Sequence, residues 1–235
     1  MIFVAIPKTG TTSVIHALNT ALPQNQKLTL LKERVNRRFR ARHGLNEIGD
    51  KRPGRAKHLS AIQIKYVLGD AEFDRCFKFT LVRNPWARMV SRYRFTHVDF
   101  EPTWRQKLKR RTTRKFHNLE FEAWLNRCWK RHKKGKRLGG QLRKLTDLNG
   151  RVLVDFVGRL EQAQDALDYV SEQVGLGRIV MPHINGTRPI HYATYYNQTT
   201  RDMVWEMCQA DIEYFNYRFE EPSAGANPDP VSEAR

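Results

Sequence analysis

The most informative stretch for the fold is the first thirteen residues, Met1-Ile-Phe-Val-Ala-Ile-Pro-Lys-Thr-Gly-Thr-Thr-Ser13. Its first six residues form a continuous apolar run with β-branched and aromatic side chains, which is typical of a buried strand in a parallel sheet. A short polar turn follows, and the residues from Ser13 to about residue 22 have the pattern of a helix that ends at Pro23. The stretch therefore predicts a strand, a polar loop and a helix in immediate succession.

The same succession recurs twice along the chain. Residues 77–82 read as a second strand, after which Asn84 is a good N-cap for a helix that starts at Pro85 and ends near residue 96. Residues 152–157 read as a third strand, and apolar residues spaced by three and four predict a helix that ends at Gly175. Repeated strand–helix units predict an α/β protein with a doubly wound, mainly parallel sheet flanked by helices. In such sheets, ligands bind at the carboxyl ends of the strands.

Three further helices are expected outside these units. Residues 59–68 predict a short helix that Gly69 stops, and residues 116–129 predict an amphipathic piece. A last helix is expected from about Thr199, a plausible N-cap, to residue 214.

Basic residues are concentrated in two segments. The net charge is +18, of which residues 32–57 carry +7 and residues 105–144 carry +14, so the rest of the chain is slightly acidic at −3. Segments of this kind bind polyanions by pairing with phosphate or sulfate groups. Solvated surface loops are the alternative interpretation.

The length and composition predict one domain in a reducing compartment. We expect a single domain over residues 1–219, with basic insertions at about 32–57 and 99–150, and a disordered tail over 220–235 that is rich in Pro, Gly, Ala and acidic residues. The three cysteines lie far apart, which argues against a disulfide framework. With no apolar run near the roughly 20 residues of a spanning helix and no leader sequence, a soluble, cytoplasmic protein is expected.

The loop after the first strand has the composition of an anion-binding site. A helix N-terminus attracts anions through its free N–H groups, and Gly10 permits a bend that turns such groups inward. Lys8 adds a positive charge, and four residues add hydroxyl donors: Thr9, Thr11, Thr12 and Ser13. The loop is not a Walker A motif, because Lys8 precedes the only glycine, and the chain has no GxGxxG motif.

Residues 7–13 resemble the 5′-phosphosulfate loop of sulfotransferases that use 3′-phosphoadenosine 5′-phosphosulfate (PAPS). That family has a second signature, an Arg at the end of a strand and a Ser eight residues later, and Arg83 and Ser91 have this spacing. Segments 153–161 and 191–217 resemble the carbohydrate (type 2) branch and its bacterial relatives, although the two basic segments match no pattern of that branch. The animal members carry a membrane anchor that is absent before the first strand here, which favours a soluble bacterial or viral relative.

The resemblance implies the P-loop-like sulfotransferase fold and an in-line transfer of a sulfuryl group. The donor would be PAPS, the product adenosine 3′,5′-bisphosphate, and the acceptor a hydroxyl or amine of a carbohydrate, such as an anionic glycan. Lys8 would stabilise the leaving phosphate, and the amides of residues 9–13 would hold the phosphosulfate. Arg83 and Ser91 would grip the 3′-phosphate, with Arg159 as a further nucleotide contact. No metal is expected, because Lys8 and the backbone donors would neutralise the charge.

A hydroxyl acceptor needs a base, and histidine is the usual choice near neutral pH. His58 precedes the short helix that leads to the Arg83 strand, where several members of the resembling branch carry a catalytic histidine. His183 is the second candidate, and His183 and Asn185 are expected near the acceptor by the same resemblance.

Two other functions compete with this interpretation. A phosphotransferase with a degenerate P-loop would need a Mg²⁺-binding acid at a strand end, whereas Asp155 is predicted inside a strand. A nonenzymatic polyanion- or nucleic-acid-binding protein would account for the basic segments. It would leave Lys8, Arg83 and Ser91 unexplained, so no specific nucleic acid is expected as a partner.

Overall fold

The computed structural model describes residues 1–22, 58–98, 119–135, 140–182 and 191–221. These residues form two compact units: unit 1 combines residues 1–83 and 139–185, and unit 2 combines residues 84–138 and 186–235. The first basic segment at 32–57 and the tail from residue 222 lie outside the described residues, and the single domain over 1–219 stays a prediction. No helix in the described ranges is both long enough and apolar enough to span a membrane.

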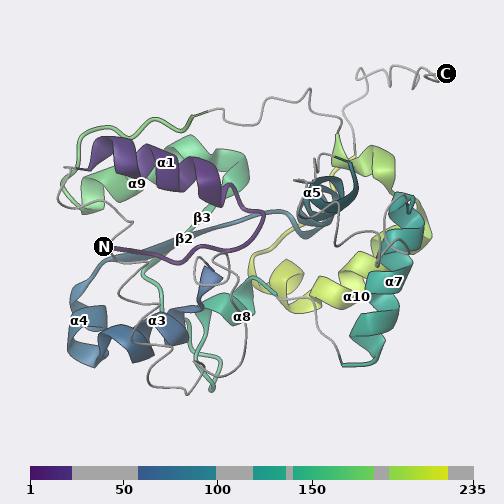
Figure 1. The fold of residues 1–235 in the computed structure, drawn as a ribbon, viewed down its shortest axis with the longest axis horizontal. Helices are drawn as coiled ribbons and strands as arrows, with labels where there is room; N and C mark the ends of the chain where they lie inside the picture. The colour runs from purple at the N-terminus through teal and green to yellow at the C-terminus, as the bar shows by residue number, and fades with distance from the viewer. Residues whose placement is uncertain (23–57, 99–118, 136–139, 183–190, 222–235) are drawn as a thin grey trace, which may run out of the picture. The chain divides into compact units, whose positions relative to one another are not determined.

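Unit 1 contains a parallel sheet with the strand order β1-β2-β3 (Figure 1). The strands are β1 (Ile2–Phe3), β2 (Lys78–Val82) and β3 (Phe156–Arg159). Ile2 pairs with Lys78, and Phe79 pairs with Phe156. The arrangement confirms the predicted α/β class with a parallel sheet.

The third strand begins later than the predicted residues 152–157. Val152 pairs instead with Thr146 in an isolated antiparallel bridge, and the ladder with β2 starts only at Phe156. Apolar residues alone therefore did not locate the strand, because part of the apolar run pairs with a different segment.

Helices cover both faces of the sheet. On one face, α1 (Thr11–Ala21) and α9 (Ala163–Gln173) share a core with β2 that includes Leu18, Phe79 and Leu167. On the other face, the Nζ atom of Lys78 lies 5.3 Å from the ring centroid of Phe73 in α4. Figure 1 shows α1 and α9 on one side of the strands, with α3 and α4 on the other. Successive side chains of β2 point to opposite faces, which explains how one strand serves both layers.

The second layer consists of short helices, α3 (Ala61–Leu68) and α4 (Asp70–Arg75). Ser60 and Gln63 form a capping box at the start of α3, and Gly69 ends it, as predicted. Two further pieces of unit 1 are α8 (Leu142–Leu145) and the 3₁₀ turn η4 (Leu160–Gln162) that leads from β3 into α9.

Unit 2 is helical and has an aromatic core. Among its described residues are α5 (Pro85–His97), α7 (Phe121–Lys133), the 3₁₀ turn η5 (Tyr192–Tyr195) and α10 (Gln198–Tyr214). The predicted N-cap Asn84 is confirmed, since its side chain accepts hydrogen bonds from the first turn of α5. The N-cap of α10 is Asn197, which forms a capping box with Thr200; the expected cap at Thr199 was wrong because that residue lies inside the first turn.

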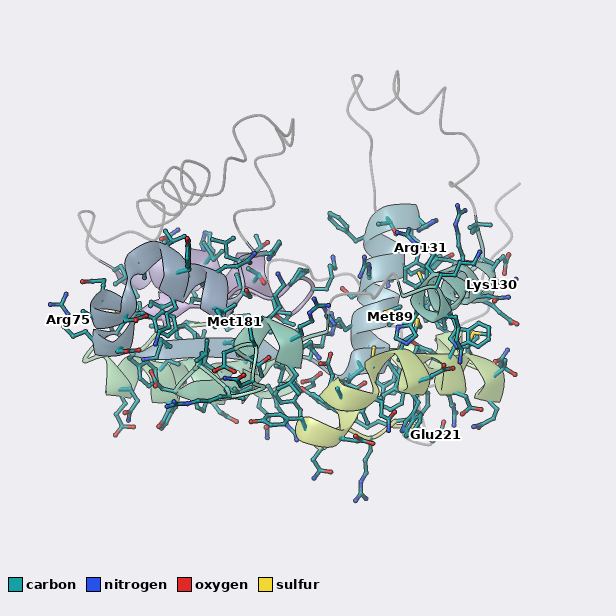
Figure 2. The ribbon with its side chains drawn as sticks, turned by 90° about the horizontal axis from the view of Figure 1, so that it is seen from below. Arg75, Met89, Lys130, Arg131, Met181 and Glu221 are labelled. Atoms are coloured by element: carbon teal, nitrogen blue, oxygen red, sulfur yellow. The ribbon has the colours of Figure 1, made fainter. Side chains whose placement is uncertain are left out.

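The predicted amphipathic piece forms α7. Trp124 and Leu125 are buried in the core that α7 shares with α10. Lys130 and Arg131, labelled in Figure 2, are exposed. The helix therefore buries an apolar face and leaves its basic residues accessible, as amphipathic helices do.

Candidate functional site

The loop between β1 and α1 has an unusual backbone. Lys8 and Gly10 both adopt left-handed conformations, with φ of 70° and 69°. The hydroxyls of Thr9 and Thr11 donate to the carbonyl oxygen of Ile6 at 3.0 and 2.6 Å. Each hydroxyl has one proton, so in this structure the donors that Thr9 and Thr11 keep for an anion are their backbone N–H groups.

Gly10 is required at its position for two reasons. Its positive φ is one that residues with a side chain rarely adopt. A Cβ atom there would also lie 2.5 Å from Cδ1 of Leu160 and 3.4 Å from Cε of Met181. The loop is thus packed closely against the segment that follows β3.

The N-terminus of α1 directly follows this loop. Its N-cap is Gly10, which has no side chain to cap the helix, and its first turn has no acidic residue. Thr12 is exposed, whereas Ser13 is buried. The positive end of the helix dipole therefore adds to the charge of Lys8.

Arg83 lies beside the loop although it is 75 residues away in sequence. It directly follows β2, and its Nη1 atom is 3.5 Å from the carbonyl oxygen of Lys8, a long and weak hydrogen bond. Its backbone is held more firmly, because the amide of Gln141 accepts from the Arg83 N–H at 2.9 Å and donates to the Arg83 carbonyl at 2.8 Å. The predicted phosphate-binding arginine and lysine thus lie together at one edge of the sheet.

His58 is attached to the same edge. Its Nδ1 atom is 2.9 Å from the carbonyl oxygen of Ala5, in the first part of the segment between β1 and α1. Since a carbonyl only accepts, this bond assigns the proton to Nδ1 and leaves the lone pair of the neutral ring on Nε2. Lys144 donates through its Nζ atom to the carbonyl oxygen of His58 at 2.6 Å.

The other predicted residues are placed as follows. Arg159 is the exposed last residue of β3, and its backbone pairs with Val82 beside Arg83. Ser91 lies in α5 of unit 2, partly buried, whereas Arg83 ends unit 1, so their joint action on one phosphate stays a prediction. His183 and Asn185 lie outside the described residues.

Sequence reasoning missed Gln141 and Lys144. Both fall in the stretch that was assigned to the basic insertion over 99–150, yet the described part from residue 140 packs in unit 1. Gln141 is fully buried. A glutamine among lysines and arginines gives no signal of burial, because glutamine is mostly an exposed residue.

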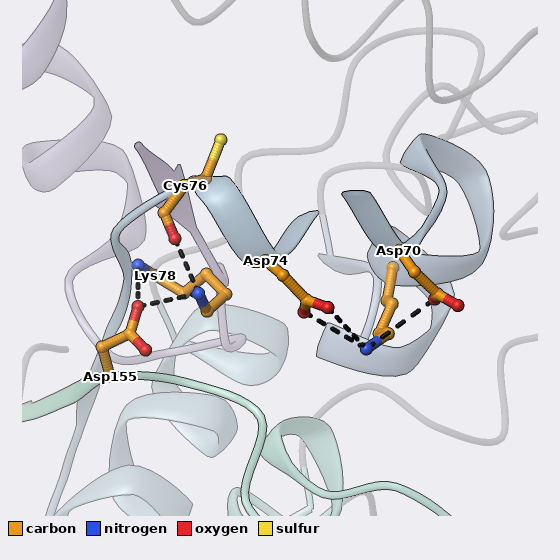
Figure 3. A network of polar contacts seen from close by, with 6 residues as sticks. Asp70, Asp74, Cys76, Lys78 and Asp155 are labelled. Atoms are coloured by element: carbon orange, nitrogen blue, oxygen red, sulfur yellow. Dashed lines mark hydrogen bonds and ion pairs between the residues drawn. The ribbon is translucent and has the colours of Figure 1, made fainter. Parts of the chain in front are cut away.

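The acidic residue that a Mg²⁺-dependent phosphotransferase would need is used elsewhere. Asp155 forms an ion pair with Lys78 at 2.9 Å and accepts a hydrogen bond from the Lys78 N–H at 2.7 Å (Figure 3). Lys78 begins β2, so this pair lies at the amino end of the strands, opposite the loop. Lys65 pairs in turn with Asp70 and Asp74. Lys65 and Lys78 therefore serve structural ion pairs.

A class of protein follows from these observations. A parallel sheet places a lysine-bearing loop, the N-terminus of α1 and an arginine at one edge, which is an arrangement suited to an α/β protein with an anionic ligand. Within the described ranges, no group of three or more His, Cys, Asp or Glu side chains is placed to hold a metal ion.

Comparison with known protein families matches residues 1–218 to the sulfotransferase family, and the chain belongs to that family. No curated protein and no solved structure matches the chain. The family confirms the predicted enzyme class, a transferase of sulfuryl groups, over the phosphotransferase and the nonenzymatic binding protein.

Proposed function

We propose that this sulfotransferase takes its sulfuryl group from PAPS and transfers it to a hydroxyl or amine of a carbohydrate, releasing adenosine 3′,5′-bisphosphate. The observation that carries the proposal is the contact of Arg83 with the loop that holds Lys8 and Gly10. One fixed cation beside an anion-binding loop suits a donor with two separate phosphate groups. PAPS supplies a sulfuryl group already activated by its link to phosphate.

The loop would bind the sulfate-bearing phosphate. Its backbone N–H groups, over residues 9–13 at the start of α1, would hold the anion, and Thr12 and Ser13 would add hydroxyls. The ammonium of Lys8 would stabilise negative charge on the oxygen that leaves the sulfur. Positioning and charge stabilisation of this kind are the main work in an in-line group transfer.

Arg83 would bind the 3′-phosphate. Its guanidinium is permanently charged and presents a planar fork of donors that matches phosphate. Ser91 would add a hydroxyl, and Arg159, at the end of the neighbouring strand, would contact the nucleotide further. Together they would distinguish PAPS from nucleotides that lack a 3′-phosphate.

His58 would act as the base for a hydroxyl acceptor. The bond from Nδ1 to the Ala5 carbonyl favours the tautomer with its proton on Nδ1, so Nε2 would be the basic atom of the ring. His183 is the alternative base, and His183 and Asn185 would contact the acceptor.

The acceptor would be a carbohydrate, and the basic segments favour an anionic glycan. Lysine and arginine side chains bind sulfate and carboxylate groups through charge-assisted hydrogen bonds. Exposed Lys130 and Arg131 on α7 belong to the second basic segment.

All three cysteines are free thiols, which supports a reducing compartment such as the cytoplasm.

Calorimetric titration at fixed salt tests the donor. Adenosine 3′,5′-bisphosphate should bind at least about tenfold more tightly than AMP or ATP, because a charged hydrogen bond contributes about 1.5–3 kcal/mol. Equal, weak and salt-sensitive binding of all three nucleotides would overturn the proposal, since the net charge of +18 attracts any anion. Transfer of labelled sulfate from PAPS to a panel of neutral and acidic glycans then identifies the acceptor class.

Three substitutions should separate binding from turnover. Arg83→Ala should weaken adenosine 3′,5′-bisphosphate by about 10- to 100-fold and leave AMP nearly unchanged. Lys8→Ala and His58→Ala should retain nucleotide binding but lower kcat by roughly 10²-fold or more, because their charge and proton acceptance act in the transition state. Calorimetry and initial-rate kinetics check the two expectations.

Arg75→Ala is the matched control, since it removes one exposed cation from α4 of the same unit. Arg75→Ala should leave the nucleotide affinities and kcat at their wild-type values. If Arg83→Ala weakened AMP as strongly as the bisphosphate, Arg83 would not be the 3′-phosphate ligand.

A further inference from the structure

Gln141 holds the backbone of Arg83 with both ends of its amide. Oε1 accepts from the Arg83 N–H at 2.9 Å, and Nε2 donates to the Arg83 carbonyl at 2.8 Å. β2 ends at Val82, which pairs with Arg159 of β3. The peptide groups of Arg83 thus lie one residue beyond the ladder, where a buried side chain satisfies both.

This pair of hydrogen bonds fixes the backbone from which the Arg83 side chain extends. Both backbone hydrogen-bonding groups of Arg83 are tied to one rigid, planar amide, so the direction of its Cα–Cβ bond is set. The guanidinium lies beside the anion-binding loop, with Nη1 3.5 Å from the Lys8 carbonyl oxygen. Since a misplacement of about 1 Å can abolish much of the benefit of a positioned group, the anchor matters for binding.

Gln141 is itself well anchored. It immediately precedes α8, in which Leu145 is fully buried and accepts a hydrogen bond from the Leu153 N–H at 2.8 Å. From the same helix, Lys144 donates to the carbonyl of His58 at 2.6 Å. One short segment, residues 141–144, therefore contacts the backbone of two residues that the proposed function uses.

We propose that Gln141 is a positioning residue that gives this enzyme its selectivity for adenine nucleotides with a 3′-phosphate. It acts through Arg83 and does not touch the nucleotide. The inference rests on the proposed function, because it takes Arg83 as the ligand of the 3′-phosphate.

The test compares wild type, Gln141→Met and Arg83→Ala by calorimetry with adenosine 3′,5′-bisphosphate and with AMP. Methionine has nearly the length of glutamine but makes neither hydrogen bond. Gln141→Met should lower the affinity for the bisphosphate about tenfold and change that for AMP less than about twofold. In the Arg83→Ala background, Gln141→Met should have no further effect on the ratio of the two affinities.

Gln164→Met is the matched control. The Gln164 amide also bridges two backbone groups of unit 1, donating to the Ile179 carbonyl and accepting from the Met181 N–H, both at 2.9 Å. Its loss should lower stability without changing the ratio of affinities. Gln141→Glu provides a second variant in case methionine prevents folding, since it keeps the acceptor for the Arg83 N–H and should give an intermediate ratio.

The outcomes distinguish a failure of the proposed function from a failure of the positioning role of Gln141. A wild-type protein that does not prefer the bisphosphate overturns the proposed function. If wild type prefers it and Arg83→Ala abolishes the preference, but folded Gln141→Met or Gln141→Glu keeps the full preference, the positioning role is wrong while the proposed function stands. If Gln164→Met changed the ratio of the bisphosphate and AMP affinities as much as Gln141→Met does, the positioning role of Gln141 would also be wrong.

Discussion

At the scale of the residue, the loop between β1 and α1 depends most on Gly10. Two independent constraints meet there: a left-handed backbone and a space too small for a Cβ atom next to Leu160. The close approach packs the segment that follows β3 against the candidate anion-binding loop.

Gly10→Ala should therefore damage both stability and nucleotide binding. The left-handed conformation costs an alanine about 1–2 kcal/mol, and the contact at 2.5 Å from Leu160 Cδ1 adds to that by pushing the loop aside. We expect a lower free energy of unfolding in urea and at least a tenfold loss of affinity for adenosine 3′,5′-bisphosphate.

Gly175→Ala isolates the backbone contribution. Gly175 has φ of +66°, but an added Cβ would meet no atom within 4 Å. This variant should lose only about 1–2 kcal/mol of stability and bind the nucleotide normally. Equal binding defects in the two variants would show that the close packing of Gly10 is unimportant.

At the scale of the element, two asparagines cap helices of unit 2, Asn84 at α5 and Asn197 at α10. Asn84 accepts from the N–H groups of Trp86 and Ala87 at 3.1 and 3.4 Å, and donates to the carbonyl oxygen of Arg218 at 2.9 Å. Asn197 also caps a helix, but it is exposed. The Asn197 amide donates to the exposed Glu122 side chain at 3.0 Å, so the two caps differ in burial and in the acceptor of the amide N–H.

Asn84→Ala should destabilise the protein more than Asn197→Ala. Loss of an N-cap costs about 1 kcal/mol, which is the expected effect at Asn197. Asn84→Ala additionally leaves the Arg218 carbonyl without this donor, which adds about 1–3 kcal/mol. Urea unfolding of both variants measures the difference; equal losses would mean that the bond to Arg218 contributes little.

Most elements were predictable from local patterns. The apolar runs located β1 and β2, the spacing of apolar residues located α9, and the Asn84–Pro85 pair located the start of α5. These signals depend on neighbouring residues only. The helix α4 escaped notice because its six residues are too few to show a period.

Contacts between distant segments were beyond such reasoning. The strand predicted at 152–157 was displaced because Val152 pairs with Thr146. Nothing local showed that Gln141 would reach Arg83, 58 residues earlier. The bonds from the Thr9 and Thr11 hydroxyls to the Ile6 carbonyl are local, but the residue types alone did not indicate them either. The residues of the candidate loop were thus predictable, whereas the residues that support them were not.

At the scale of the whole molecule, groups buried in unit 2 should make stability depend on alkaline pH. Unit 2 buries two weak acids in or beside its aromatic core. Burial, together with the nearby Asp211, raises the pKa of the Cys208 thiol to about 12, and burial also holds the pKa of Tyr196 well above its usual range. Both groups are therefore neutral in the folded protein where they would ionise in the unfolded chain.

Stability should fall as the pH rises above about 9. A raised folded-state pKa means that the contribution of Cys208 is fully present below its unfolded value of 9.0 and is lost as pH rises toward 12. Three pH units correspond to at most about 4 kcal/mol. Urea unfolding between pH 8 and pH 11 measures the slope.

Cys208→Ala should flatten that slope, even though the smaller side chain lowers stability at neutral pH. Cys76→Ala is the control, because that thiol is only partly buried and should leave the slope as in wild type. A Cys208→Ala protein with the wild-type dependence on pH would assign the alkaline loss to other groups.

At Lys8, the residue that would be best for stability differs from the residue that the proposed reaction needs. With φ of 70°, Lys8 keeps a conformation that is strained for any residue with a side chain and natural for glycine. Exchange for glycine would relax the loop and remove the ammonium that the transfer is proposed to need. Directed evolution for heat resistance alone would thus favour an inert protein, and any consensus-based redesign of this enzyme should keep Lys8 fixed.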